Sequence, residues 1–383
     1  MRQVMNTEPV PIKFWLDDIE EGALQQARNL ARLPFVHKWV AIMPDSHQGF
    51  GMPIGGVLAT KDVIIPNAVG VDIGCGIAAV QTSIEGIDTD TLKAIMGRVR
   101  EAVPVGFNHH REAQHWDGFD QAPDLPIIQQ ELASARRQLG TLGGGNHFIE
   151  FQADEVGRLW VMLHSGSRNF GLKVAKVYHQ QAQALCERWH VQLPDKDLAY
   201  LPMGDQAGQD YFAAMTYCLE FAQANRDHMM NAVLEAVGDL VGGQLISWIN
   251  IHHNYAALEN HHGENVWVHR KGATRARAGE VGIIPGSMGS SSYIVEGLGN
   301  PESFQSCSHG AGRKLGRRQA ERTLNLDEEQ AKMDALGIVH GLRGKGGLDE
   351  APGAYKDIDT VMANQADLVK IITRLRPLGS IKG

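Results

Sequence analysis

One short loop constrains this chain more than any other stretch, the sequence GVDIGCG at residues 70–76. It lies between two apolar runs, 63–65 and 77–80, so we expect it to join buried β-structure. Its glycines permit a tight turn from which Asp72 and Cys75 point into one pocket. A carboxylate with a thiolate is typical of a transition-metal site. The alternative is a turn with a buried free cysteine, because free cysteines are often core residues.

The composition bounds the class of protein. A chain of 383 residues with 43% hydrophobic and 21% charged residues is typical of a globular protein with an ample core. It has no apolar run of the length that spans a membrane and no secretory signal at its start, so we expect no membrane association. Its four cysteines show no disulfide-framework spacing, which predicts a reducing cytoplasm. A net charge of −8 argues against non-specific nucleic-acid binding but allows a local basic groove.

Hydrophobic periodicity and turn residues predict both helices and strands. Helices are expected at residues 20–32, 91–102, 127–139, 170–190, 208–241 and 358–374, with a basic helix opening at 308–313. Strands are expected near 12–15, 40–43, 54–83, 159–164, 245–251, 266–268 and 283–284. We interpret Asp45 and His47, where the second strand ends, as part of a turn. Without a linker or repeat, the expected fold is α+β: a single compact domain over residues 1–383, with mixed β-sheets flanked by helices and a site built from strand-end loops.

At four histidines an apolar strand meets a loop that carries glycine, serine or asparagine: His147, His164, His253 and His309. One such histidine is usually structural, but four of them beside Asp72 and Cys75 favour a metal site. Ligand softness alone favours zinc for such a set. Glycine-rich loops at 143–145, 286–289 and 310–312 are suited to nucleotide phosphates, although none matches a P-loop or a Rossmann fingerprint.

With these residues the chain resembles the RtcB family, GTP-dependent ligases that join RNA 3′-phosphate or 2′,3′-cyclic phosphate ends to 5′-hydroxyl ends. The resemblance runs from about residue 10 to the last residue. The motifs that carry it are MPDSHQGFG at 43–51, GVDIGCG at 70–76, LGGGNHFIE at 142–150, LHSGSR at 163–168, HHNYA at 252–256, RKGA at 270–273, IIPGSMG at 283–289, SCSHGAGR at 306–313, AYKDID at 354–359 and the final KG.

The resemblance implies two Mn²⁺ ions in place of zinc. One is held by Cys75, His164 and His253, and the other by Asp72, Cys75 and His147, with the thiolate shared. It also implies that His309 is the nucleophile that takes GMP from GTP. The implied GTP contacts are Asn146, Phe148, Glu150, Asn254, Pro285, Gly286, Ser287, Met288, Ser292, Gly310, Ala311, Gly312, Tyr355 and Lys382. Arg168 and Arg313 are the candidates for binding the RNA phosphate.

The implied role is RNA repair or tRNA splicing, with an accessory protein such as archease as a further expected partner. The loop at about 107–126 and the region 340–350 depart from the family pattern, which bears on the choice of RNA. Two alternatives stay open: a metal-dependent RNA cyclic-phosphate hydrolase, and a non-catalytic RNA-end sensor. A hydrolase needs only the metals, whereas sealing needs His309, the guanine contacts and Lys382 together.

Overall fold

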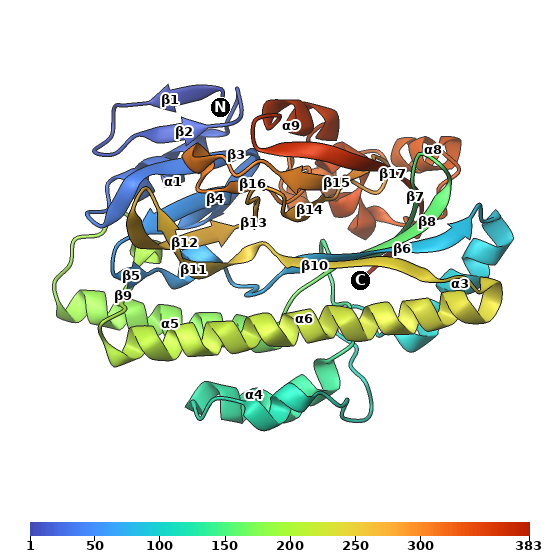
Figure 1. The fold of residues 1–383 in the computed structure, drawn as a ribbon, viewed down its shortest axis with the longest axis horizontal. Coiled ribbons are helices and arrows are strands. Elements are labelled where there is room, and N and C mark those ends of the chain that lie inside the picture. The colour runs from blue at the N-terminus through green and yellow to red at the C-terminus, as the bar shows by residue number, and fades with distance from the viewer.

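Two β-sheets carry the fold in the computed structural model, which describes residues 1–383 (Figure 1). The six-stranded sheet has the spatial order β1 (Gln3–Met5), β2 (Ile12–Phe14), β3 (Val36–Phe50), β4 (Met52–Thr60), β12 (Glu264–Lys271), β11 (Asn254–His261). The seven-stranded sheet has the order β10 (Leu245–His252), β6 (Gly76–Glu85), β8 (Arg158–Ser165), β7 (Phe148–Ala153), β17 (Val369–Lys382), β15 (Ser292–Gly297), β14 (Val281–Ile284). Two small ladders pair β13 (Ala273–Arg275) with β16 (Ser306–Ser308), and β5 (Val63–Ile64) with β9 (Leu201–Pro202).

Strand pairing brings distant segments together. Neighbouring strands are antiparallel except β2 and β3, which are parallel, so the sheets are mixed as predicted. In the larger sheet β17 lies between β7 and β15 and sets Lys382 opposite Phe148. The chain's last strand is therefore next to the strand that follows the glycine loop at 143–145.

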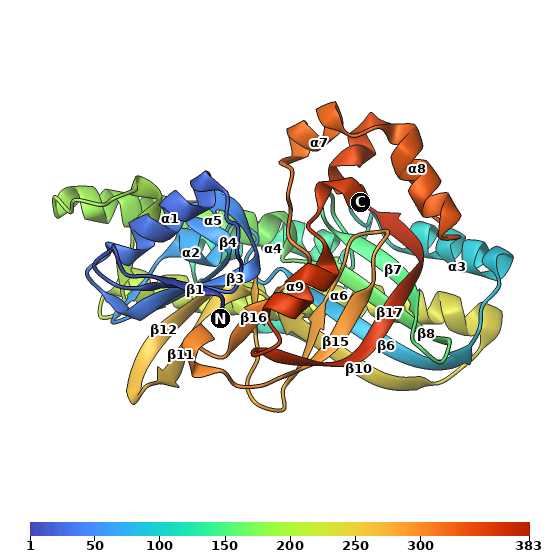
Figure 2. The same cartoon turned by 90° about the horizontal axis from the view of Figure 1, so that it is seen from above.

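The helices cover the outer sides of the sheets and confirm the α+β class. They are α1 (Glu21–Ala31), α2 (Pro66–Val69), α3 (Thr89–Ala102), α4 (Pro126–Gln138), α5 (Arg168–Arg188), α6 (Gln206–Val241), α7 (Arg317–Thr323), α8 (Leu326–Ala335) and α9 (Ile358–Asn364). Short 3₁₀ turns lie at Asp117–Gln121, Lys196–Leu198, Pro301–Ser303, Lys345–Glu350 and Pro352–Ala354. Figure 2 shows α7 and α8 projecting beside the end of β17. None of the helices, even the 36-residue α6, combines the length and apolarity needed to cross a membrane.

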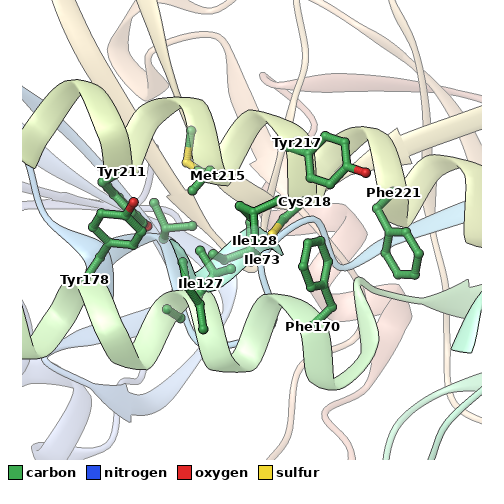
Figure 3. Close-up of a cluster of buried hydrophobic side chains, with 14 of the residues drawn as sticks. Ile73, Ile127, Ile128, Phe170, Tyr178, Tyr211, Met215, Tyr217, Cys218 and Phe221 are labelled. Atoms are coloured by element: carbon green, nitrogen blue, oxygen red, sulfur yellow. The ribbon is translucent and has the colours of Figure 1, made fainter. Parts of the chain in front are cut away.

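The largest core lies between α4, α5 and α6 (Figure 3). Phe170 of α5 stacks edge-on against Tyr217 and Phe221 of α6, and all three side chains are buried. Burial of one such side chain contributes about 1.5–3 kcal/mol, so this helical layer is firmly held. On α6, the apolar residues Met215, Met229 and Val233 are fully buried, whereas Phe212 and Leu219, which belong to the same apolar pattern, are partly buried.

The 70–76 loop is placed by this helical layer. Gly74 has a φ of 73°, and a side chain there would come within 2.9 Å of the Cβ of Ala222 on α6. Only glycine combines that backbone conformation with so close an approach. The loop therefore rests on α6 and delivers Cys75 to the start of β6.

Two helix predictions near the end of the chain were wrong. The basic helix begins only at Arg317, because residues 309–316 form a loop packed against β3; a side chain at Gly312 would meet the backbone oxygen of Asp45 at 2.1 Å. The helix predicted at 358–374 ends at Asn364, and residues 369–382 form β17. Ile371 pairs with Val295 of β15, so sheet contacts decide the conformation of a stretch that periodicity assigned to a helix.

Candidate active site

The predicted residues converge on a cavity of about 740 Å³ where the ends of the two sheets meet. Of the residues predicted from the sequence, its wall contains Asp72, Cys75, Asn146, Phe148, Glu150, His164, His253, Asn254, Pro285, Gly286, Ser287, Met288, His309, Gly310, Ala311, Gly312, Arg313, Tyr355 and Lys382. Three others, His147, Arg168 and Ser292, are not part of this wall and contact residues that are near it.

The Cys75 thiol is the centre of a buried cluster. Its Sγ lies 3.1 Å from Nε2 of His164 and 3.5 Å from Nε2 of His147. From there the cluster extends in two directions: His164 Nε2 is 3.0 Å from His253 Nε2, and His147 Nε2 is 3.1 Å from the Asp72 carboxylate. Cys75, His147 and His164 place their ligand atoms within 4.8 Å of one another, so they could hold a metal ion.

A backbone carbonyl orients each of these two imidazoles through the ring nitrogen that faces away from Cys75. His147 Nδ1 lies 2.9 Å from the Leu142 carbonyl, and His164 Nδ1 lies 3.0 Å from the Asn146 carbonyl. A carbonyl only accepts, so Nδ1 of each ring carries a proton and Nε2 faces the cluster, where Nε2 of His164 is left as an acceptor. Arg168 Nη1 also lies 3.4 Å from His147 Nδ1, but two donors do not bond, and the shorter contact fixes the tautomer.

His253 has the same tautomer for a different reason. Its Nδ1 is 3.3 Å from Oδ1 of Asn254, and that oxygen accepts a 2.8 Å hydrogen bond from the backbone N–H of Gly272. Asn254 also donates to the Asp72 carbonyl at 3.0 Å. Asn254 therefore joins the two halves of the cluster, in addition to lining the cavity.

The electrostatics of the cluster fit a cation. Burial lowers the pKa of His164 and of His253 well below 6.5, so both imidazoles are neutral. Their Nε2 atoms then face each other at 3.0 Å with lone pairs and no proton between them, a repulsion that a bound cation removes. Burial and the nearby Asp72 carboxylate raise the pKa of the Cys75 thiol, which a metal would lower.

Helix α6 supports the cluster with two fully buried polar side chains that the sequence did not single out, Asn225 and Arg226. Arg226 donates from Nη1 to the carbonyls of Gly74 and Ser165, both at 2.9 Å, which fixes the residues flanking Cys75 and His164. Asn225 accepts from the backbone of residues 140 and 141 and donates to the carbonyl of Gly166 at 3.2 Å. In the sequence, the adjacent Asn and Arg within the otherwise apolar face of this helix could have indicated that these two residues have a special role.

His309 is held by a carboxylate that lies 264 residues away. Its Nδ1 is 2.6 Å from the Asp45 carboxylate, which also accepts from the His309 backbone N–H at 3.1 Å. Asp45 is fully buried, and its bond to Nδ1 leaves Nε2 of His309 free as a nucleophile or base. The ring lies 4.7 Å from that of His253, between their centroids. The turn predicted at Asp45 was wrong, because Asp45 lies within β3, and its place in MPDSHQGFG is the only sequence signal of a further role.

A second buried carboxylate, Glu150, lies in the cavity wall on β7. Burial raises its pKa to about 8, against the hydrogen bond from Gln152 and the charge of Lys382. Gln152 donates from Nε2 to Glu150 at 2.5 Å and to Ser292 Oγ at 3.0 Å, and Ser292 Oγ accepts from Gly286 N–H at 3.1 Å. Gln152 thus links two residues predicted to contact the nucleotide.

Glu350 contacts several polar and charged side chains at the other side of the cavity. It accepts from the Tyr355 hydroxyl and, at 3.0 Å, from Arg313, and it lies 3.5 Å from the Lys382 ammonium. The exposed Arg317 is 3.2 Å away. Arg313 therefore reaches the cavity as part of an ion-pair network. Glu350 belongs to the region 340–350 that departs from the family pattern, which gave no sign of this contact.

Comparison with known proteins gives a consistent answer. A family model described as tRNA-splicing ligase RtcB matches residues 26–383. The RNA-splicing ligase RtcB of Escherichia coli (strain K12) is 40% identical, with 100% of this chain and 99% of that protein covered. The tRNA-splicing ligase RtcB of Pyrobaculum aerophilum is 33% identical, with 98% and 95% covered. The RNA-splicing ligase RtcB of Mycobacterium tuberculosis is 33% identical, with 94% and 100% covered.

Proposed function

The chain belongs to the RtcB family and is an RNA ligase of splicing or repair, and from this premise we propose its reaction. It joins RNA 3′-phosphate or 2′,3′-cyclic phosphate ends to 5′-hydroxyl ends, using GTP and two Mn²⁺ ions. The observation that carries the proposal is His309, whose Nε2 is left free by Asp45 beside the Cys75 cluster in one cavity.

His309 is proposed as the nucleophile. Its Nε2 attacks the α-phosphorus of GTP, a P–N bond forms, and the P–O bond to pyrophosphate breaks. Asp45 holds the Nδ1 proton and stabilises the positive charge that develops on the ring. An oxygen of the RNA 3′-phosphate then displaces His309 and gives an RNA-ppG end. The 5′-hydroxyl attacks the 3′-phosphate of this end and GMP leaves; water opens a cyclic phosphate beforehand.

The metal ligands are proposed to form two sets that share Cys75. His164 and His253 complete one set, and Asp72 and His147 complete the other, in keeping with the two directions in which the cluster extends. Bound cations at this position would neutralise phosphate charge and stabilise the thiolate. The protein's own part is to hold the Nδ1 side of each ring, so that the three Nε2 atoms face the cluster around Cys75.

The guanine base is proposed to bind at the Glu150 side of the cavity. Once ionised, the Glu150 carboxylate accepts from N1–H and the N2 amino group, which adenine lacks in that arrangement, and the Lys382 ammonium can donate to O6. Lys382 lies 5.1 Å from the centre of the Phe148 ring, and Tyr355 lines the same cavity. The Pro285–Met288 loop, the Gly310–Gly312 loop and Asn146 are the proposed contacts of the ribose and phosphates.

The remaining assignments concern the RNA and the setting of the reaction. Arg168 and Arg313 are proposed to bind the RNA phosphate. Because the site draws on residues from Asp45 to Lys382, we propose that residues 1–383 act as one catalytic domain. A thiolate ligand favours a reducing cytoplasm. An archease-type accessory protein is a proposed partner, and multiple turnover by the purified chain alone would exclude a strict need for it.

The test is covalent labelling with GTP that carries the label in its α-phosphate. With Mn²⁺, wild type should form an acid-labile guanylate adduct and His309→Ala should not. The same variant should still seal RNA that already carries a 3′-ppG end, since that step does not need the nucleophile. A guanylate adduct on the His309→Ala protein would refute the assignment. Opening of cyclic phosphates without GTP and without sealing would support the hydrolase alternative.

A further inference from the structure

Three phenylalanine or tryptophan side chains are largely exposed to solvent: Phe50 at 68%, Phe107 at 103% and Trp189 at 42%. Single exposed apolar residues are ordinary on protein surfaces and need no explanation. One of these three, Phe50, lines the reaction cavity, and a second, Phe107, lies next to a backbone contact with the glycine loop at 143–145. They have no role in the metal or nucleotide assignments made above.

Phe50 lies in the cavity wall itself. It is the last residue of β3, at the turn into β4, and its ring is exposed while its backbone is fixed. The Lys271 ammonium donates to the Phe50 carbonyl at 2.6 Å and to the Asn67 carbonyl at 2.9 Å. A buried lysine therefore anchors the residue, and the aromatic face is left open on the cavity side.

Phe107 lies in the connection between α3 and α4 and has no side-chain partner. The backbone on either side is pinned: Gly106 N–H donates to the Gly143 carbonyl at 2.8 Å, and His110 N–H donates to the Arg137 carbonyl at 3.0 Å. A fully exposed ring thus stands on an anchored turn beside the glycine loop that leads to the metal cluster.

The same glycine loop is flanked by cations. The Arg168 guanidinium fills the space that a side chain at Gly143 would need, and that of Arg317 lies within 3.4 Å of such a position at Gly145. Lys314, Arg317, Arg318 and Arg322 are exposed on the segment after His309, and the first two line the cavity. A chain with a net charge of −8 therefore presents exposed cations in the cavity wall that contains Phe50, and others beside the glycine loop that anchors the Phe107 turn.

Exposed aromatic faces next to cations are the means by which proteins hold single-stranded nucleic acid, since every base has a face that stacks and every nucleotide a phosphate. We propose that the rings of Phe50 and Phe107 stack against the bases of the RNA nucleotides next to the two ends being joined. The inference rests on the proposed function, because it takes the polynucleotide to be held at this cavity. A protein partner fits less well, since each ring is isolated and not part of a contiguous apolar patch.

The test compares Phe50→Ala and Phe107→Ala with the matched control Trp189→Ala, an exposed aromatic on a surface that has no contact with the cavity. Each phenylalanine variant should weaken RNA binding, measured as the apparent KM in ligation and by fluorescence anisotropy, by roughly 5- to 100-fold, the size of one base–aromatic stack. Substitution by tryptophan should restore binding. The control should bind RNA as wild type does.

Abasic RNA separates stacking from a structural effect. When the base next to the 3′-phosphate or next to the 5′-hydroxyl is removed, the RNA affinity of wild type should fall to that of one alanine variant. The affinity of that alanine variant should not fall any further. This assigns each ring to one end. Wild-type binding by both alanine variants, or a defect that persists with RNA abasic at both ends, would overturn the proposal. The anisotropy arm needs no catalysis, so it tests stacking even if guanylylation of His309 fails.

Discussion

At the scale of single residues, the Asp45–His309 pair determines which ring nitrogen is available for chemistry. We predict that Asp45→Asn reduces the rate of guanylate-adduct formation by about 100-fold or more, because an amide can present a donor to Nδ1 and favour the wrong tautomer. The measurement is a time course of labelling from GTP. Sealing of RNA that carries a preformed 3′-ppG end is the control and should be much less affected; an equal loss in both assays would contradict an orienting role.

Glu150 links pH to stability with a definite sign. Its folded-state pKa of about 8 lies above the value of 4.5 for an unperturbed glutamic acid, so between these pH values the folded protein holds a proton that the unfolded chain releases. Stability is therefore lost as pH rises from about 4.5 to about 8, by on the order of a few kcal/mol.

We predict that Glu150→Gln removes this loss. Its melting temperature should match that of wild type near pH 5 and exceed it by several degrees at pH 8, in thermal scans without nucleotide. The same change should weaken the preference for GTP over ATP in adduct formation, because an amide keeps one acceptor oxygen and cannot accept from both N1–H and the N2 amino group. A melting difference that is constant between pH 5 and pH 8 would show that Glu150 ionises normally.

At the scale of elements, α6 is both a wall of the core and the support of the metal loops. We predict that Arg226→Met destabilises the protein by on the order of 3 kcal/mol, because the carbonyls of Gly74 and Ser165 lose their donor while still buried. Urea unfolding measures the loss, and Mn²⁺ titration should show weaker binding. The control is Arg188→Met, an exposed arginine near the end of the adjacent helix α5. Equal stability of the two variants would mean that Arg226 is dispensable.

The sequence predicted this element well because its signal is local. Met215, Met229 and Val233 recur with the helical period over a length that tertiary contacts do not override. The stretch at 369–374 is short and apolar, and its conformation is decided by β15, which lies far away in sequence. Local periodicity carries no information about such a partner.

The site divides in the same way. The motifs around Cys75 and His164 identify these residues as members of the site, because glycine loops and strand ends can be recognised in the amino-acid sequence. The sequence did not assign Asp45 and Glu350 to the site, since each becomes functional only through contact with a residue that folding brings near it. The sequence shows that a carboxylate is present at each of these positions, but it does not show which residue that carboxylate contacts.

At the scale of the whole molecule, metal binding should stabilise the fold, because the cluster joins loops from β6, β7, β8 and β10. We predict that a saturating excess of Mn²⁺ raises the melting temperature by a few degrees, and that a chelator reverses this. Cys75→Ala should abolish most of the shift, since its sulfur is shared by both ligand sets, whereas Cys186→Ala, which lies in the helical core, should keep it. A full shift in the Cys75→Ala protein would rule out a shared thiolate.

The position of β17 has a consequence for how the protein is made. Residues 369–382 fill the gap between β7 and β15, so a ribosome that has synthesised only the residues before β17 holds a sheet in two pieces, each with an unpaired edge. Until β17 arrives, those edges can pair with other nascent chains, and the interval lengthens when translation of residues 369–382 slows. The enzyme's yield in a cell should therefore depend on the codons for β17 and on chaperones that cover exposed strands.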